Sequence, residues 1–140
     1  MWIPNNLDEF IGNSVNISKI KDWFENFDTN KKKCLLLIGP TGSGKTLLAQ
    51  LLLQYYNYNK NEFNGCDLKT KKNVNHTLYK ILFHKNILEM FLDNKAGIII
   101  DELENMLSSN DKSGINEFIQ ILKKDNIYNP IIITLMNNVN

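Results

Sequence analysis

Arginine is absent from this 140-residue sequence, and all 16 basic residues are lysines. Small-molecule kinases usually clamp phosphate groups with arginines, whose planar guanidinium bonds two oxygens at once, so this class of enzyme is disfavoured. Cysteine is also scarce. Cys34 and Cys66 are the two in the chain, and two such thiols suit a reduced intracellular protein better than a disulfide framework.

Long apolar runs and strong net charge are missing as well. No run approaches the roughly 18 residues of a membrane span, and no charged-then-apolar leader opens the chain, so we expect an intracellular protein without a membrane partner. Hydrophobic residues make up 43% and charged residues 22% of the sequence, which is typical of a globular domain. A net charge of +1 gives no basis for inferring nucleic-acid binding from charge alone.

Apolar segments of strand length alternate with segments of helical periodicity. This alternation predicts an α/β domain with a parallel sheet covered by helices. The run CLLLIG at 34–39 shows no polar alternation, which predicts a strand covered on both faces. The expected strands are 34–39, 61–66, 96–100 and 131–136, and the expected helices run from Ser14 to about Phe27, from Thr46 to about Tyr56, over 75–92 and over 114–124.

The segment GPTGSGKT at 39–46 follows the first predicted strand and opens the next predicted helix. It matches the phosphate-binding pattern G-x-x-x-x-G-K-[ST], in which glycines let backbone N–H groups turn toward phosphate oxygens. We therefore predict that this loop binds a nucleotide, with Lys45 reaching the β- and γ-phosphates and the Thr46 hydroxyl binding Mg²⁺. The predicted contact residues are Gly39, Pro40, Thr41, Gly42, Ser43, Gly44, Lys45 and Thr46.

An acidic pair ends the third predicted strand, in the segment GIIIDE at 97–102. In this position Asp101 would reach the Mg²⁺ shell, and Glu102 would polarise a water molecule for attack on the γ-phosphate. The alternative is that the pair simply ends a strand at the surface. A GTPase should show Asn-Lys-x-Asp after a strand, and NKAG at 94–97 has no Asp and precedes its strand. ATP hydrolysis is therefore the favoured reaction.

Together these motifs resemble the AAA+ ATPases, in particular the large subunits of replication factor C, the eukaryotic and archaeal sliding-clamp loader. The resemblance implies a P-loop AAA+ domain spanning residues 1–140 and incomplete at its C-terminal side, ending before the fifth core strand and the helical lid. The stretches that carry it are LDEFIGN (7–13) with the Trp23-Phe24 helix, EFNGCDLKTK (62–71), DELENMLSSNDKSGINEFIQILK (101–123) and NPIIITLMNN (129–138).

The same resemblance implies further site residues and partners. Ile11, Gly12 and Leu47 would contact the nucleotide, and Asn137 would be the sensor residue at the end of the last strand, with Asn138 as the alternative. Clamp-loader relatives form ring-shaped hetero-oligomers that place a sliding clamp on primer-template DNA. The segment Lys69, Thr70 and Lys71 would contact duplex DNA phosphates without sequence preference. The implied location is the nucleus or a viral replication compartment.

The sequence departs from the family pattern in ways that keep alternatives open. An Arg-Ser pair of the family is Lys69-Thr70 here, which loses the guanidinium fork, and the family's Lys-Tyr-x-Pro after the first tryptophan is missing. The run from Lys69 to Lys72 is equally compatible with a solvated basic turn.

Two other functions remain, namely another AAA+ replication or checkpoint ATPase, and a non-catalytic nucleotide-binding module. Relatives complete their sites with arginines from a neighbouring subunit and the lid.

Overall fold

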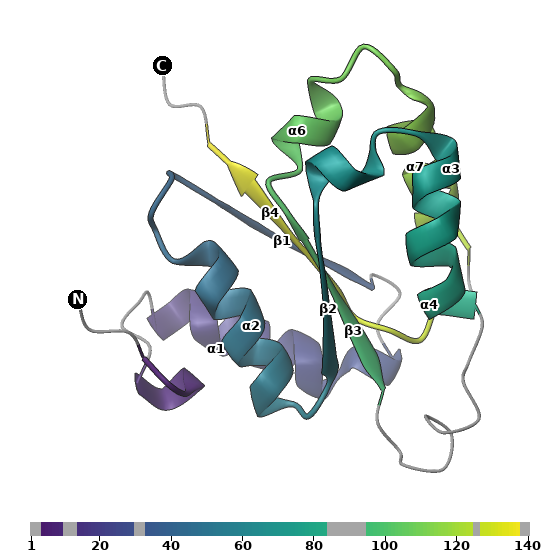
Figure 1. Ribbon diagram of the computed structural model, residues 1–140. Helices are drawn as coiled ribbons and strands as arrows, with labels where there is room; N and C mark the ends of the chain where they lie inside the picture. The colour runs from purple at the N-terminus through teal and green to yellow at the C-terminus, as the bar shows by residue number, and fades with distance from the viewer. Residues whose placement is uncertain (1–3, 10–13, 30–32, 84–94, 125–126, 138–140) are drawn as a thin grey trace.

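A four-stranded parallel sheet forms the centre of the molecule, in the order β1-β4-β3-β2. The computed structural model describes residues 4–9, 14–29, 33–83, 95–124 and 127–137 (Figure 1). The predicted helix-covered parallel sheet is confirmed. Its strands are β1 (Cys34–Gly39), β2 (Asn59–Asn64), β3 (Ala96–Asp101) and β4 (Ile131–Met136).

Helices cover both faces of this sheet (Figure 1). Helices α1 (Ser14–Glu25) and α2 (Lys45–Tyr55) lie on one face. The other face carries α7 (Ser113–Leu122) and a helical stretch made of α3 (Lys71–Val74), the π-helical turn η4 (Asn75–Tyr79) and α4 (Lys80–Phe83). Short elements complete the fold: η1 (Leu7–Glu9), η2 (Phe27–Thr29), η3 (Gly65–Leu68) and α6 (Glu104–Leu107). No helix of the described residues is long and apolar enough to cross a bilayer.

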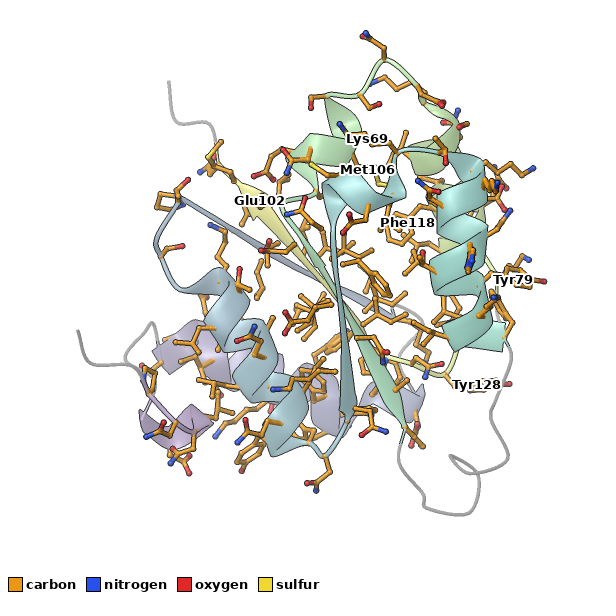
Figure 2. All side chains as sticks on the ribbon, viewed as in Figure 1. Lys69, Tyr79, Glu102, Met106, Phe118 and Tyr128 are labelled. Carbon is orange, nitrogen blue, oxygen red and sulfur yellow. The ribbon has the colours of Figure 1, made fainter. Side chains whose placement is uncertain are left out.

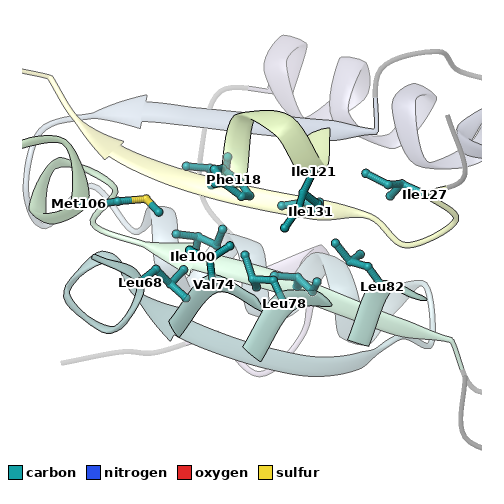
Figure 3. Packing of buried hydrophobic residues seen from close by; sticks show 12 residues of the cluster. Leu68, Val74, Leu78, Leu82, Ile100, Met106, Phe118, Ile121, Ile127 and Ile131 are labelled. Atoms are coloured by element: carbon teal, nitrogen blue, oxygen red, sulfur yellow. The ribbon is translucent and has the colours of Figure 1, made fainter. Parts of the chain in front are cut away.

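The isoleucine runs of β3 and β4 supply both cores, because successive strand residues point to opposite faces. Ile98, Ile100 and Ile131 pack with the helices of the α7 face (Figure 3). Ile99 and Ile132 pack with α1 and α2 on the opposite face. Since each fully buried isoleucine contributes about 1.5–3 kcal/mol, these two strands anchor the sheet whose carboxyl ends carry the acidic pair and the sensor candidate.

Two predicted boundaries were wrong. Strand β2 runs over Asn59–Asn64, two residues earlier than expected, because the Asn64 side chain accepts from Cys66 N–H at 3.0 Å and caps η3. The third helix begins at Lys71 rather than 75, where the Thr70 hydroxyl accepts from Asn73 N–H at 3.2 Å. Its predicted part beyond Phe83 lies outside the described residues.

The expectation that β1 is covered on both faces was also wrong. Among the described residues β1 pairs with β4 alone and forms an edge of the sheet. Leu36 is 46% exposed and Ile38 57% exposed, although both are apolar. An exposed apolar edge strand is a template for pairing with another chain, so self-association must be controlled in any experiment on this protein.

Both cysteines are free thiols, as the sequence predicts. Burial raises the pKa of the Cys34 thiol to about 12, so it stays protonated and unreactive at neutral pH.

Candidate nucleotide-binding site

The loop between β1 and α2 turns through two glycines in left-handed conformations. Gly42 has a φ of 79° and Gly44 a φ of 83°, values that residues with a side chain rarely adopt. Helix α2 begins directly afterwards, and Gly44 has no side chain with which to cap it. The first-turn N–H groups of α2 therefore face the loop, where the positive end of the helix dipole favours an anion.

The Lys45 ammonium folds back across this loop. Its Nζ donates to the carbonyl oxygens of Gly39 at 2.8 Å and Pro40 at 2.7 Å, and Ser43 Oγ lies at 3.4 Å. A cation beside a helix N-terminus is unfavourable unless an anion lies between them. The loop thus concentrates positive potential in the arrangement that the phosphate-binding motif predicts.

Thr46 and Asp101 are 55 residues apart in sequence and meet in the structure. The Thr46 hydroxyl donates to Asp101 Oδ1 at 2.7 Å. A hydroxyl and a carboxylate are hard oxygen ligands that suit Mg²⁺, which commonly binds one or two carboxylates together with phosphate oxygens. These residues fit the predicted metal site, with Thr46 and Asp101 as the protein ligands.

A pocket of about 290 Å³ lies over this pair, and acidic side chains outnumber basic ones in its lining. Three carboxylates line it, those of Asp101, Glu102 and Glu104, against the single ammonium of Lys45. Nucleotide phosphates alone would be repelled by this excess of negative charge. A divalent cation bound with the phosphates would offset it, so the pocket favours a metal–nucleotide complex over the free nucleotide.

Glu102, the predicted base, is held by two amide side chains. Asn64 Nδ2 at the end of β2 donates to Glu102 Oε2 at 3.0 Å, and Asn105 Nδ2 donates to the same oxygen at 3.1 Å. Asn105 also donates to Asn64 Oδ1 at 3.0 Å. The register explains the meeting, because Asn64 pairs with Asp101 at the carboxyl ends of β2 and β3.

A second pocket, of about 590 Å³, adjoins the first at Gly44 and Lys45. Apolar side chains of α1 and β1 line much of it, including Ile17, Ile20 and Leu35. An apolar hollow beside a phosphate-binding loop can accept a flat nucleobase. Leu47, predicted to contact the nucleotide, lines the smaller pocket.

The end of β4 lies against the phosphate-binding loop. Asn137 N–H donates to the Gly39 carbonyl at 3.0 Å, and Thr41 Oγ1 lies 3.0 Å from Met136 Sδ. Asn137 therefore lies beside the loop through a backbone contact, and its role as the sensor residue stays a prediction. The other candidate, Asn138, and the predicted nucleotide contacts Ile11 and Gly12 lie outside the described residues.

The predicted DNA-contact segment joins η3 to α3 and is docked on α7. Gly114 N–H donates to the Lys69 carbonyl at 3.2 Å, and Lys71 N–H donates to Ser113 Oγ at 3.1 Å. The Lys71 ammonium lies 3.6 Å from Glu117. Thr70 serves as the helix cap, so its hydroxyl has a structural partner. Figure 2 shows Lys69 and Glu102 toward the same end of the molecule.

Sequence reasoning missed four polar residues at the site: Asn64, Asn105, Glu104 and Thr134. The Thr134 hydroxyl bonds Asp101, and the Glu104 carboxylate accepts from Met136 N–H at 3.2 Å. A signal existed for Thr134, because it interrupts the apolar run IIITLM. Asparagine is so abundant here that neither Asn64 nor Asn105 stood out.

Comparison with known proteins agrees with this geometry. A model of the family described as "ATPase family associated with various cellular activities (AAA)" matches residues 35–140. The chain belongs to the AAA family. The match begins at the second residue of β1 and includes the phosphate-binding loop, the acidic pair Asp101-Glu102 and strand β4.

Among curated proteins, the AAA chain resembles replication factor C large subunits. It is 30% identical over 98% of its length to that of Methanococcus maripaludis (strain C6 / ATCC BAA-1332), and 31% identical over 94% to that of Methanococcus vannielii. It spans 30% and 26% of those relatives' lengths. Among solved structures, a Thermotoga maritima RuvB Holliday junction branch migration motor superposes with a TM-score of 0.60 at 23% identity, covering 95% of this chain and 41% of that one. This likeness confirms the AAA+ P-loop fold.

Proposed function

We propose that this chain binds Mg²⁺-ATP and hydrolyses it within a sliding-clamp loader resembling replication factor C, in the position of the large subunit. The observation that carries the proposal is the hydrogen bond from Thr46 to Asp101 beneath the Lys45 loop. This bond brings the two motifs together, which supports a single site that binds phosphates at one end and Mg²⁺ at the other. The similarity to replication factor C large subunits supports the choice of assembly.

The residues divide the work by position. Lys45 and the first turn of α2 would hold the phosphates. Thr46 and Asp101 would hold Mg²⁺, which would stabilise the charge that develops on the γ-phosphate. Glu102 would accept a proton from the attacking water, and Asn137, the residue after β4, would contact the γ-phosphate. The apolar pocket beside α1 takes the base. The proposed partners are the other subunits of the ring, a sliding clamp and primer-template DNA. The proposed location of the chain is intracellular, in the nucleus or a viral replication compartment.

A non-catalytic nucleotide-binding module is the second candidate. It is favoured by the two amide donors that hold the Glu102 carboxylate and by the absence of arginine from the sequence. Such a module would bind ATP to fix assembly geometry and would not need Glu102 as a base.

Replacing Glu102 with glutamine in the assembled loader separates the two candidates. We expect Glu102→Gln to bind ATP as tightly as wild type and to lose about 10² to 10⁴ in hydrolysis rate, since a general base contributes that much. Phosphate release and nucleotide titration measure the two quantities. Glu62→Gln, an exposed glutamate on β2, is the matched control. A wild-type rate that is already at background and that Glu102→Gln leaves unchanged would favour the non-catalytic module. Normal hydrolysis in the variant would mean that another base acts.

DNA contact through Lys69 and Lys71 is a separate prediction. Each phosphate contact that is lost should flatten the slope of log affinity against log salt by about 0.9 on duplex DNA, so the double alanine variant of the assembled loader should lose about 1.8. A double variant of Lys60 and Lys123, both exposed and away from this segment, removes the same charge as a control. Equal slopes in both double variants would identify the segment as a solvated basic turn.

A further inference from the structure

Thr134 is buried, and it is the one polar residue of strand β4. It is 1% exposed and follows three isoleucines in β4. A buried hydroxyl without partners destabilises a fold, so its partners indicate why it is there. Those partners belong to the acidic pair: the hydroxyl bonds Asp101 Oδ1 at 2.5 Å and Glu102 N–H at 2.9 Å.

The direction of these bonds is fixed by their chemistry. The Glu102 N–H can only donate, so the Thr134 oxygen accepts there. Its single proton is then available for Asp101 Oδ1, the oxygen that also accepts from Thr46 at 2.7 Å. Two hydroxyls, one from α2 and one from β4, thus converge on one carboxylate oxygen. Together they fix the rotation of the Asp101 carboxylate.

Thr134 also holds the backbone turn at Glu102. The paired register of β3 and β4 ends at Ile100 and Ile133, and Glu102 follows with a φ of 54°. This left-handed conformation is strained for a residue with a side chain, by about 1 kcal/mol or more. Glu102 N–H donates to the Thr134 hydroxyl and Leu103 N–H donates to the Thr134 carbonyl at 3.0 Å. Thr134 therefore accepts hydrogen bonds from two consecutive backbone N–H groups of the turn, those of Glu102 and Leu103.

We infer that Thr134 is a positioning residue of the nucleotide site, acting through Asp101 to set the metal-binding geometry. The inference rests on the proposed Mg²⁺-ATP function and adds a residue to it. It predicts a specific defect: loss of the hydroxyl should weaken the contribution of Mg²⁺ to nucleotide binding, while the phosphate-loop contribution stays intact.

Thr134→Val tests this inference, because valine keeps the shape and removes the hydroxyl. ATP affinity is measured with Mg²⁺ and with a chelator, and the ratio of the two affinities is compared between proteins. We expect this ratio to fall about tenfold in Thr134→Val, with affinity in chelator unchanged within about twofold, and to remain near the wild-type value in Thr134→Ser. Thr77→Val is the control. The Thr77 hydroxyl, in η4, donates to the Asn73 carbonyl of α3 at 2.7 Å.

A wild-type ratio in Thr134→Val would overturn the inference, as would equal losses in the valine and serine variants, which would assign the effect to packing. Should the valine variant fail to fold, Thr134→Ala against Thr134→Ser makes the same comparison, because they differ by the hydroxyl oxygen. The wild-type titration keeps the two claims apart: absence of Mg²⁺-dependent binding there contradicts the proposed function itself.

Discussion

We expect the 140-residue chain by itself to bind Mg²⁺-ATP and to hydrolyse it about 10³ to 10⁵ times more slowly than within an assembled ring. In P-loop enzymes an arginine supplied to the γ-phosphate contributes that factor, which corresponds to about 4 to 7 kcal/mol of barrier. This chain contains no arginine. A lysine is a poor substitute, because its compact ammonium lacks the planar fork that spans several transition-state oxygens.

The measurement is phosphate release by the purified chain, alone and within the ring. Leu36 and Ile38 lie exposed on an edge strand, so each preparation must first be shown to be monodisperse by light scattering. Lys45→Ala is the control for contaminating ATPases. A monodisperse chain that turns over ATP at about 1 per second, an ordinary enzymatic rate, with Lys45→Ala abolishing it, would show that no arginine from a partner is needed.

The second large effect should come from Lys45→Ala, which we expect to weaken Mg²⁺-ATP binding by roughly 100-fold or more. Charge-assisted hydrogen bonds to phosphate are among the strongest in proteins. Lys45 is the single cation among the residues that line the pocket of about 290 Å³ over Thr46 and Asp101. Its removal leaves three carboxylates there without a positive side chain. The loop geometry should persist, because the left-handed Gly42 and Gly44 set it.

Titration of Lys45→Ala with Mg²⁺-ATP measures this loss, and a melting curve shows whether the variant is folded. Lys60→Ala, which removes an exposed lysine of β2, is the matched control and should bind as wild type. Undiminished affinity in a folded Lys45→Ala protein would mean that the nucleotide binds elsewhere.

The parts of this structure that the sequence predicted best are those specified by short stretches of chain. The phosphate-binding loop is fixed by glycines, a strand and a helix that are adjacent in sequence, so its conformation follows from local chemistry. The pairing of Thr46 with Asp101 was also predictable. The carboxyl ends of parallel strands meet at one edge of a sheet, and the motif already assigned both residues to one ion.

The remaining features depend on contacts that no single stretch contains. The run CLLLIG has the composition of a central strand, but exposure of Leu36 and Ile38 depends on which elements pack beside β1. The hydrogen bond from the Asn64 side-chain amide to Glu102 requires β2 to pair with β3 in a register that places Asn64 beside Asp101. Thr134 could be noticed in its apolar run, but its partners follow from the β3–β4 register. Register arises from tertiary packing, which periodicity does not specify.

The most direct test of the central claim, that the loop and the acidic pair form one Mg²⁺-ATP site, is calorimetric titration of the folded wild-type chain with ATP in Mg²⁺ and in chelator. We predict one saturable site per chain that is markedly tighter with Mg²⁺, because Asp101, Glu102 and Glu104 repel uncompensated phosphate charge. Absence of saturable binding up to about 1 mM Mg²⁺-ATP, or equal affinity with and without Mg²⁺, would contradict it.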